Sequence, residues 1–198
     1  MKITFLRHGS LLPPFDDYNS LSLDELSRLA RQEIDPSVDP SKISSKLELV
    51  DLLEKKYDAL FVSSSKRTHD TAKELTKKFD LPRLVELKEV NEILFDPSQL
   101  VSEKEYEQGK LAVIRKKLFK NLANDTNIEP GSSVADRIIR LDEIIHESKA
   151  EAVLVITHGF FMRYLDIFYR QKSRVFDENA LNQAVNYDYV SGFTAIIS

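Results

Sequence analysis

The sequence predicts an α/β fold, a three-layer α/β/α sandwich around a mostly parallel central sheet. Three short runs, at residues 3–6, 59–62 and 152–156, are almost continuously apolar and rich in residues that favour strands. Strands covered on both faces, as in a parallel sheet, have continuous apolar runs rather than alternating ones. Stretches with helical periodicity separate the runs, and this alternation favours helices on both faces of a sheet.

Five stretches between and after these runs predict helices. Residues 23–34 follow Ser22, and Glu25 stands three positions after Ser22, which is the spacing of a capping box. Apolar residues recur at i, i+3 and i+4 in three further stretches, at residues 46–57, 66–79 and 133–147. Residues 160–169 are apolar on nearly every side, which is typical of a buried helix.

Two longer stretches do not fit a simple alternation of strand and helix. In residues 10–45 we expect loops around one helix, because prolines interrupt the stretch at Pro13, Pro14, Pro36 and Pro40. Residues 97–130 are dense in charge but have apolar residues at helical spacing, namely Leu111, Ile114, Leu118 and Leu122. We interpret this stretch as a helical cap insertion within a single domain of residues 1–198; the alternative is an ordinary pair of surface helices.

Composition excludes several classes of function. The 198 residues fit one domain, and 28 Lys and Arg against 32 Asp and Glu give a net charge of −4. This balance leaves no broad basic surface for nucleic acid or anionic lipid. The absence of cysteine excludes disulfides and thiol catalysis. The apolar stretch before Arg7 is too short for a signal peptide, and no run approaches the ~18 residues of a membrane span. We therefore expect a cytoplasmic protein that binds neither membrane nor nucleic acid.

All three apolar runs end abruptly in polar residues that suit an anion. Arg7 and His8 follow the first run, Arg67 lies shortly after the second, and His158 follows the third. Ligands of open parallel sheets bind beyond the carboxyl ends of the strands, near a topological switch point. The second and third ends also begin predicted helices, whose N-terminal N–H groups favour anions. We therefore expect these four side chains to converge on one anion.

The same residues resemble the histidine phosphatase superfamily, the phosphoglycerate mutase-like proteins. The matching motifs are Leu6-Arg7-His8-Gly9, the Ser-x-x-x-Arg pattern from Ser63 to Arg67, and Val155-Ile156-Thr157-His158-Gly159. Their order and spacing agree over residues 1–165, with a last strand expected near residues 193–197. One departure is Ser64, which stands where the family usually has proline.

By this resemblance His8 is the nucleophile, and Arg7, Arg67 and His158 bind the phosphate of the substrate. Arginine forks match phosphate oxygens bidentately and stay charged. Nearby arginine cations also favour the neutral form of His8, which is the form that attacks phosphorus. The resemblance thus implies a phosphatase that hydrolyses a small phosphomonoester through a phosphohistidine on His8, with no cofactor and no metal.

The acid that protonates the leaving group is expected among Glu86, Glu89 and Glu92. Relatives carry a Glu after the third strand region, and residues 90–96 resemble the segment in which an aromatic residue follows that Glu by three positions. We select Glu92, which Phe95 follows at that distance. Glu89 is the competitor, because a Leu-x-Glu element also occurs in relatives. At least one of the three carboxylates is an ordinary solvated loop residue.

Other polar candidates have simpler explanations. His69 and His146 lie in predicted helices and are expected on the solvated faces. His8, His158 and Glu92 together match a His/His/carboxylate metal set, but two arginines at the same place would repel a dication. We therefore expect no metal.

Three alternatives to a phosphatase can be compared with the sequence. Mutases usually continue from Arg-His-Gly into a Glu-Ser-x-Trp-Asn-like stretch, whereas residues 10–14 are Ser-Leu-Leu-Pro-Pro and the chain has no Trp. A non-catalytic phospho-ligand-binding module of the same fold would be expected to lose His8 or an arginine, and this chain keeps them. A kinase or nucleotide-binding protein would need GxxxxGK[ST] or GxGxxG, which are absent. The sequence determines neither the physiological substrate nor the oligomeric state.

Overall fold

A five-stranded sheet in the order β3-β2-β4-β1-β5 forms the centre of the computed structural model, which describes residues 1–47, 52–54 and 56–197. The strands are β1 (Lys2–Arg7), β2 (Ala59–Val62), β3 (Leu84–Glu86), β4 (Ala152–Thr157) and β5 (Gly192–Ile196). The first four run parallel, and β5 pairs antiparallel with β1 at one edge. The predicted α/β fold with a mostly parallel sheet is therefore confirmed, as is the last strand.

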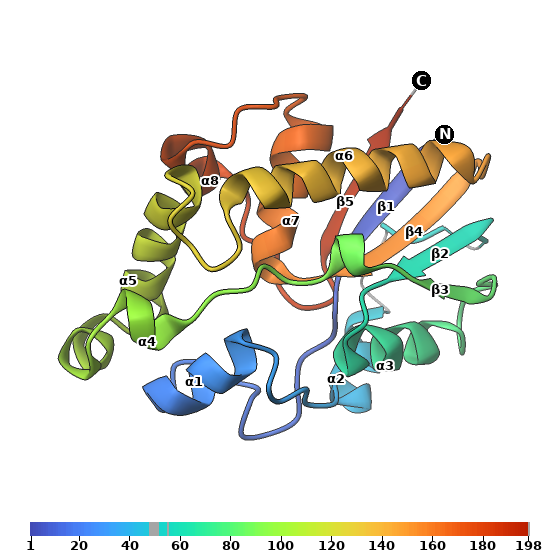
Figure 1. Cartoon of the computed structure of the whole chain (residues 1–198). Coiled ribbons are helices and arrows are strands. Elements are labelled where there is room, and N and C mark those ends of the chain that lie inside the picture. The colour runs from blue at the N-terminus through green and yellow to red at the C-terminus, as the bar shows by residue number, and fades with distance from the viewer. Residues whose placement is uncertain (48–51, 55, 198) are drawn as a thin grey trace.

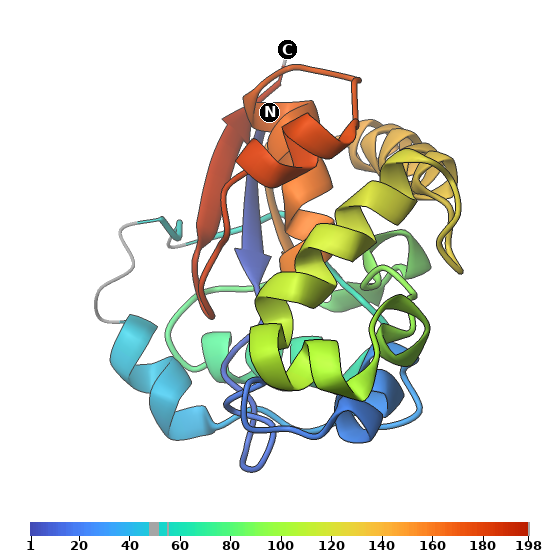
Figure 2. The ribbon, with the colours of Figure 1, turned by 90° about the vertical axis from the view of Figure 1, so that its left-hand side faces the viewer.

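Helices connect the strands and cover both faces of the sheet (Figure 1). They are α1 (Leu23–Ala30), α2 (Pro40–Leu47), α3 (Lys66–Leu75), α4 (Pro97–Leu100), α5 (Glu103–Ala123), α6 (Gly131–Glu147), α7 (Gly159–Leu165) and α8 (Glu178–Gln183). A 3₁₀ turn, η1 (Lys88–Val90), follows β3, and a π-helical turn, η2 (Asp166–Arg170), continues α7. Figure 2 shows α2 on one side of the sheet and α6, α7 and α8 on the other.

Successive residues of β4 point into opposite layers. Val153 and Val155 belong to the core shared with α6 and α7, whereas Leu154 and Ile156 belong to the core shared with α2 and α3. All four side chains are fully buried. Because the strand is covered on both faces, both sets of residues must be apolar, which explains the unbroken apolar run in the sequence.

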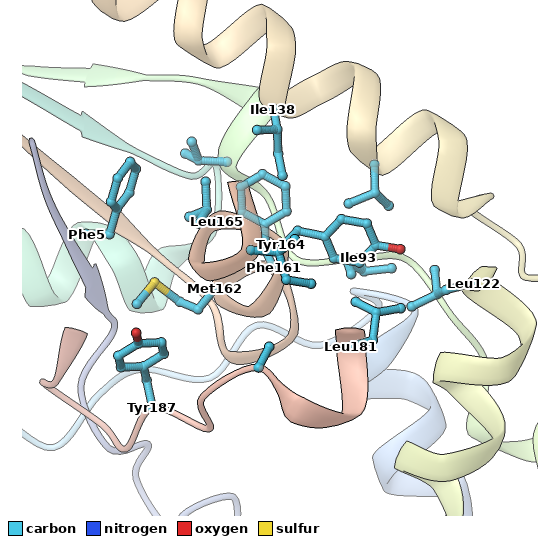
Figure 3. Packing of buried hydrophobic residues seen from close by; sticks show 14 of the residues in the cluster. Phe5, Ile93, Leu122, Ile138, Phe161, Met162, Tyr164, Leu165, Leu181 and Tyr187 are labelled. Atoms are coloured by element: carbon cyan, nitrogen blue, oxygen red, sulfur yellow. The ribbon is translucent and has the colours of Figure 1, made fainter. Parts of the chain in front are cut away.

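The larger core lies between the sheet and helices α5 to α8 (Figure 3). The predicted apolar face of α6 is completely buried in it, with Val134, Ile138, Leu141 and Ile145 all at 0% exposure. Helix α7 is buried on nearly all sides, as predicted. Burial of each such side chain contributes roughly 1.5–3 kcal/mol to the free energy of unfolding. Helices α6 and α7 are therefore held firmly against the sheet.

The predicted capping box at the start of α1 is confirmed. The N–H of Glu25 donates to Ser22 Oγ at 3.2 Å, and the N–H of Ser22 donates to Glu25 Oε2 at 2.9 Å. The helix ends earlier than the expected residue 34, because Gln32 adopts a positive φ of 61° that an α-helix does not accommodate.

Of the helix predicted at residues 46–57, only Lys46 and Leu47 are helical among the described residues, and they are the end of a helix that begins earlier. Helix α2 instead begins at Pro40, whose ring is tolerated in the first turn, and the Asp39 carboxylate caps it by accepting the N–H of Ser41 at 3.0 Å. Residues 52–54 and 56–57 are not helical, and the N–H of Tyr57 donates to the carbonyl of Asp80 as the chain approaches the sheet. Residues 48–51 and 55 lie outside the described residues. The stretch 10–45 accordingly holds α1 and most of α2, not one helix.

Residues 97–130 are mostly helical, as predicted, and form α4 and α5. Helix α5 is interrupted at Lys110, whose φ of 46° and ψ of −139° separate a short first segment from a longer second one. In the second segment Ile114, Leu118 and Leu122 join the larger core. Within the described part of the chain, no helix has both the length and the apolarity needed to span a bilayer.

Candidate active site

The carboxyl ends of β1, β2 and β4 are neighbours, because β4 occupies the position between the other two strands. Arg7 and His8 leave β1, Arg67 lies in the first turn of α3 after β2, and His158 precedes α7 after β4. The rings of His8 and His158 are 5.2 Å apart between centroids, and Arg67 Nε lies 3.1 Å from His158 Nδ1. The structure therefore brings the sequence-predicted cluster together.

His8 is a buried, neutral imidazole with one ring nitrogen engaged. Its side chain is 2% exposed, and Nδ1 lies 2.8 Å from the carbonyl oxygen of Gly9. Since a carbonyl only accepts, Nδ1 carries the proton and Nε2 keeps its lone pair. Burial lowers the pKa of His8 well below its ordinary value, and the charges of Arg67 and Arg7 lower it further.

Gly9 allows the turn after β1 to pack closely under the site. A Cβ at this position would lie 2.5 Å from the Ile43 side chain of α2. The N–H of Gly9 donates to Thr71 Oγ1 of α3 at 2.9 Å, so the turn that carries His8 is bound directly to the helix that carries Arg67.

Arg7 is held in place by two contacts and still has an unused donor. Its Nη1 donates to the carbonyl of Tyr187 at 2.7 Å, and its guanidinium carbon lies 4.2 Å from the centre of the Tyr189 ring. Its buried Nε has no hydrogen-bond partner among the described residues. The Tyr189 ring also lies 5.6 Å from the His8 ring, so it packs against both groups.

Arg67 is oriented by an aspartate that the sequence did not indicate. Asp35 Oδ1 accepts from Arg67 Nη1 at 3.2 Å, and Oδ2 accepts the N–H of Lys66 at 2.5 Å, in the first turn of α3. One carboxylate thus caps the helix and directs the guanidinium. No sequence pattern links residues 35 and 67, which meet because the segment after α1 lies against the first turn of α3.

The imidazole of His158 is hydrogen-bonded to the guanidinium of Arg67. Since Arg67 Nε can only donate, His158 Nδ1 is the acceptor, so Nε2 carries the proton and donates to Ser63 Oγ at 2.7 Å. The pKa of His158 is held well below its ordinary value, first by burial and then by Arg67. Both ring nitrogens are therefore engaged by protein groups in this structure, and direct contact of His158 with a phosphate stays a prediction.

Glu92 is the one of the three candidate acids that borders the cavity beside His8. Its carboxylate accepts the N–H groups of Phe161 at 2.9 Å, Ile93 at 3.1 Å and Phe160 at 3.2 Å. Burial raises the pKa of Glu92, although the three N–H groups and Arg67 oppose the shift. A carboxyl with a raised pKa keeps its proton to a higher pH, as a general acid requires.

The other acids and histidines that the sequence offered lie elsewhere. Glu86 is exposed and 3.2 Å from His69, and Glu89 does not line the cavity. His146 is exposed on α6, where Nδ1 lies 2.8 Å from the carbonyl of Asp142. Within the described ranges, no three His, Asp or Glu side chains are gathered closely enough to hold a metal ion.

A cavity of about 280 Å³ opens beside Arg7, His8, Arg67 and Glu92. Its apolar wall comes from three regions of the chain, namely Leu26, Leu29 and Ala30 of α1, Leu111 and Ile114 of α5, and Phe95 and Phe160. Arg115, also from α5, lies in the same wall. In the sequence, the one available signal for Arg115 was its position four residues after Leu111, an apolar residue of α5.

Comparison with known proteins places these features in context. The family model of the histidine phosphatase superfamily (branch 1) matches residues 3–172. A solved structure of an Escherichia coli protein, proposed to be an alpha-ribazole-5'-P phosphatase, has a TM-score of 0.67 and 18% identity, covering 100% of this chain and 91% of that chain. No curated protein sequence matches this chain.

Two further solved structures represent different activities. A phosphoglycerate mutase from Bacillus anthracis has a TM-score of 0.59 and 16% identity, covering 98% of this chain and 86% of that chain. A mycobacterial glucosyl-3-phosphoglycerate phosphatase in complex with VO3 has a TM-score of 0.62 and 16% identity, covering 98% and 91%. At such identities the likeness shows a shared fold.

Proposed function

Because the chain belongs to the histidine phosphatase superfamily (branch 1), we propose that it hydrolyses a small phosphomonoester through a phosphohistidine on His8. The observation that carries the proposal is the state of His8. The imidazole is buried and neutral, its Nδ1–H is bonded to Gly9, and its Nε2 lone pair is free beside the guanidinium groups of Arg7 and Arg67. Such a group is an activated nucleophile next to an anion site.

The two arginines bind the phosphoryl group that is transferred. A phosphate monoester carries up to two negative charges, and its transfer depends mainly on positioning and charge stabilisation. Arg7 has its unpaired Nε at the site, and Arg67 is kept in direction by Asp35. In this proposal His158 contributes to the phosphate pocket as well, with its ring kept neutral by burial.

In the first step Nε2 of His8 attacks phosphorus, and the bond between phosphorus and the ester oxygen breaks. Glu92, protonated because its pKa is raised, gives its proton to the departing oxygen, so the leaving group departs as a neutral alcohol. The product on the enzyme is a phosphohistidine, and Glu92 is now a carboxylate.

In the second step a water molecule attacks the phosphorus of the phosphohistidine, and the bond between phosphorus and Nε2 breaks. The Glu92 carboxylate takes the proton of the attacking water, which restores the acid for the next cycle. The products are inorganic phosphate and the neutral imidazole of His8. Side-chain cations supply the charge stabilisation in both steps, so we propose that turnover needs no metal ion.

Hydrolysis is favoured over the mutase reaction because the segment after Gly9 lacks the mutase-like stretch and the chain contains no Trp. Residues 97–130 act in this proposal as a helical cap of the single domain. The supporting observation is that Leu111, Ile114 and Arg115 of α5 line the same cavity as Arg7 and His8. In this proposal these residues contact the leaving group and so determine which substrate binds. The residues at the carboxyl ends of the strands carry out the phosphoryl transfer.

The test traps the covalent intermediate. Wild type, His8→Ala and the control His69→Ala are mixed with ³²P-labelled substrate in the presence of EDTA and quenched without acid. We expect acid-labile, base-stable label on wild type and His69→Ala and none on His8→Ala, which also loses turnover. Unlabelled wild type together with an active His8→Ala variant would exclude the mechanism. Loss of activity in EDTA, restored by a divalent ion, would exclude metal independence, and label passing to a second substrate molecule instead of water would favour the mutase.

A further inference from the structure

We propose that Tyr189 is a positioning residue for phosphoryl transfer, because its aromatic ring holds the Arg7 guanidinium in the place from which Arg7 binds the phosphoryl group. This inference rests on the proposed phosphatase function and adds a residue to it. Tyr189 belongs to residues 184–191, the connection between α8 and β5. Two observations carry the inference, the position of the ring against Arg7 and the strained backbone of the next residue, Val190.

The Arg7 guanidinium lies over the ring of Tyr189. Its central carbon is 4.2 Å from the centre of the ring, well within the ~6 Å over which an aromatic face attracts a cation. Burial raises the pKa of Tyr189, so the ring is neutral and attracts the cation through its π electrons. This contact uses none of the N–H groups of Arg7, of which only Nη1 is bonded to protein, at the carbonyl of Tyr187.

A neutral ring stands beside Arg7, whereas a carboxylate stands beside the other arginine of the site. Asp35 Oδ1 accepts from Arg67 Nη1 at 3.2 Å, but the described residues give Arg7 no carboxylate partner. A carboxylate would compete with the phosphoryl group for the charge of Arg7. The Tyr189 ring orients the guanidinium and leaves its charge to the substrate.

The first turn of α7 fills space around the same guanidinium. A Cβ on Gly159 would lie 3.1 Å from the central carbon of the Arg7 guanidinium and 3.2 Å from its Nε. Arg7 is therefore packed against both α7 and the Tyr189 ring. Replacing the ring by a smaller side chain gives the guanidinium room to turn away from the phosphoryl group.

The backbone next to Tyr189 is strained. Val190 has a positive φ of 52°, a conformation that a β-branched residue adopts only at a cost. It is 2% exposed, and its N–H lies 3.2 Å from the carbonyl oxygen of Arg7 and 3.3 Å from that of His8. Strain of this kind persists where the surrounding structure enforces it, and it is concentrated at functional sites. Here the strained turn fixes the preceding residue, Tyr189, against the end of β1.

Two buried side chains that take no part in the proposed chemistry anchor residues 184–191. The hydroxyl of Tyr187 donates to Asp166 Oδ1 at 2.7 Å, and Arg163 Nη1 donates to the carbonyl of Ala184 at 2.7 Å. Asp166 and Arg163 are 0% and 3% exposed. The position of Tyr189 is thus determined by the folded core before substrate binds, which is the preorganisation that charge stabilisation requires.

Two other roles for Tyr189 make different predictions. Tyr189 lines the cavity, and its ring lies 5.6 Å from the ring of His8. A contact with the leaving group would make the effect of a substitution depend on the leaving group, and a direct effect on His8 would persist when Arg7 is replaced. Positioning of Arg7 affects the phosphoryl group, which all substrates share, and it disappears with Arg7.

The first test compares wild type, Tyr189→Leu and Tyr189→Phe on 4-nitrophenyl phosphate and glycerol 3-phosphate. We expect Tyr189→Leu to lower kcat/KM about tenfold on both esters, because the displaced guanidinium stabilises the transferred group less. Tyr189→Phe keeps the ring and should stay within about twofold of wild type. Phe176→Leu removes a half-buried ring that stacks on Tyr164 outside the cavity, so it is the matched control and should leave kcat/KM unchanged.

A double-mutant cycle with Arg7→Met then identifies the partner of the ring. In the Arg7→Met background, Tyr189→Leu should cause little further loss. A loss as large in that background as in wild type would overturn the inference. So would no loss in Tyr189→Leu, a loss that differs between the two esters, or a loss that Tyr189→Phe reproduces. Tyr189→Met, which fills more of the volume of the ring, replaces Tyr189→Leu if that variant does not fold.

Failure of the proposed function is seen separately, as wild type that hydrolyses neither ester. In that case the same cycle is measured by calorimetric binding of inorganic phosphate. We expect Tyr189→Leu to weaken phosphate binding where Arg7 is present and to have little effect in Arg7→Met. Equal results for wild type and Tyr189→Leu would overturn the positioning role whatever reaction the protein catalyses.

Discussion

At the scale of single residues, the pKa values of His8 and Glu92 are shifted in opposite directions by the same cause. Burial disfavours charge, so it lowers the pKa of the imidazole and raises the pKa of the carboxyl. The nucleophile therefore stays neutral to a lower pH, and the acid stays protonated to a higher pH, than the unperturbed side chains would. This is the combination of states that the first step of the proposed mechanism requires.

The pH dependence of turnover follows from these directions. With an alkyl phosphate, kcat/KM should rise as the pH passes upward through the pKa of His8, well below 6.5, because the imidazole must be deprotonated. It should fall as the pH passes upward through the pKa of Glu92, above 4.5, because the acid loses its proton. We expect an acidic optimum, measured from initial rates at constant ionic strength.

Replacing Glu92 by Gln should remove the alkaline limb of this profile and slow alkyl phosphates by about 100-fold or more, the contribution typical of general acid catalysis. Aryl phosphates with good leaving groups should lose much less, because their oxygen departs without a proton. Glu89→Gln is the control and should behave as wild type. An alkaline limb that persists in Glu92→Gln but is lost in Glu89→Gln would assign the acid to Glu89.

At the scale of secondary-structure elements, helix α6 holds the loop that carries Glu92. Arg137 Nη1 donates to the carbonyls of Asn91 at 2.9 Å, Glu89 at 3.2 Å and Lys88 at 3.3 Å. Its guanidinium carbon also lies 4.6 Å from the centre of the Phe161 ring, on the helix whose N–H groups bind Glu92. Arg137 is thus a positioning residue that connects two elements around the proposed acid.

Arg137→Met should lower kcat for alkyl phosphates about tenfold, or ~1.4 kcal/mol in the barrier, because the Glu92 carboxyl loses its fixed position. The alkaline limb should also move to higher pH, since the nearby cation no longer favours the Glu92 carboxylate. Arg137→Lys should keep the limb near its wild-type position, and the exposed Arg140→Met of the same helix is the control. A lower melting temperature with an unmoved limb would mean that Arg137 is structural only.

At the scale of the whole molecule, two buried neutral histidines couple stability to pH. The pKa values of His8 and His158 are lowered well below 6.5 in the folded chain, whereas in the unfolded chain they return to about 6.5. Below that pH the unfolded state binds more protons, so the free energy of unfolding decreases as the pH falls. This contribution is fully present above pH 6.5 and is lost as the pH falls toward the folded-state pKa values.

Each histidine should contribute a slope of about 0.7 kcal/mol per pH unit at pH 6.5, which approaches about 1.4 kcal/mol per pH unit one unit lower. Urea unfolding between pH 7 and 5.5 measures it, with slopes expected to be shallower in His8→Asn and in His158→Asn than in wild type. His146→Asn, exposed on α6, controls for the loss of a histidine as such. The slope is the readout, so a variant that is less stable at every pH still gives an answer. Unchanged slopes in both variants would contradict the buried neutral state.

The sequence by itself determined the α/β class, the strands β1, β2 and β4, and the meeting of Arg7, His8, Arg67 and His158. These features follow from local pattern. A strand covered on both faces must be continuously apolar, and the carboxyl ends of neighbouring parallel strands share one edge. The short β3 was missed because three partly exposed residues leave no such pattern. The helix expected at residues 46–57 was wrong at the described residues 52–54 and 56–57, because α2 begins at Pro40 and its described part ends at Leu47.

Only the tertiary structure decided which groups complete the site. Asp35 reaches Arg67 across 32 positions, and Glu92 is distinguished from Glu89 by the N–H groups of α7. Arg115 lines the cavity, and its buried Nε has no hydrogen-bond partner among the described residues. Each of these facts is a matter of direction and burial, between segments that are distant in the sequence. Periodicity shows which face of a helix is apolar. The role of a charged residue, by contrast, depends on the groups that pack around it, and these are brought together only when the chain folds.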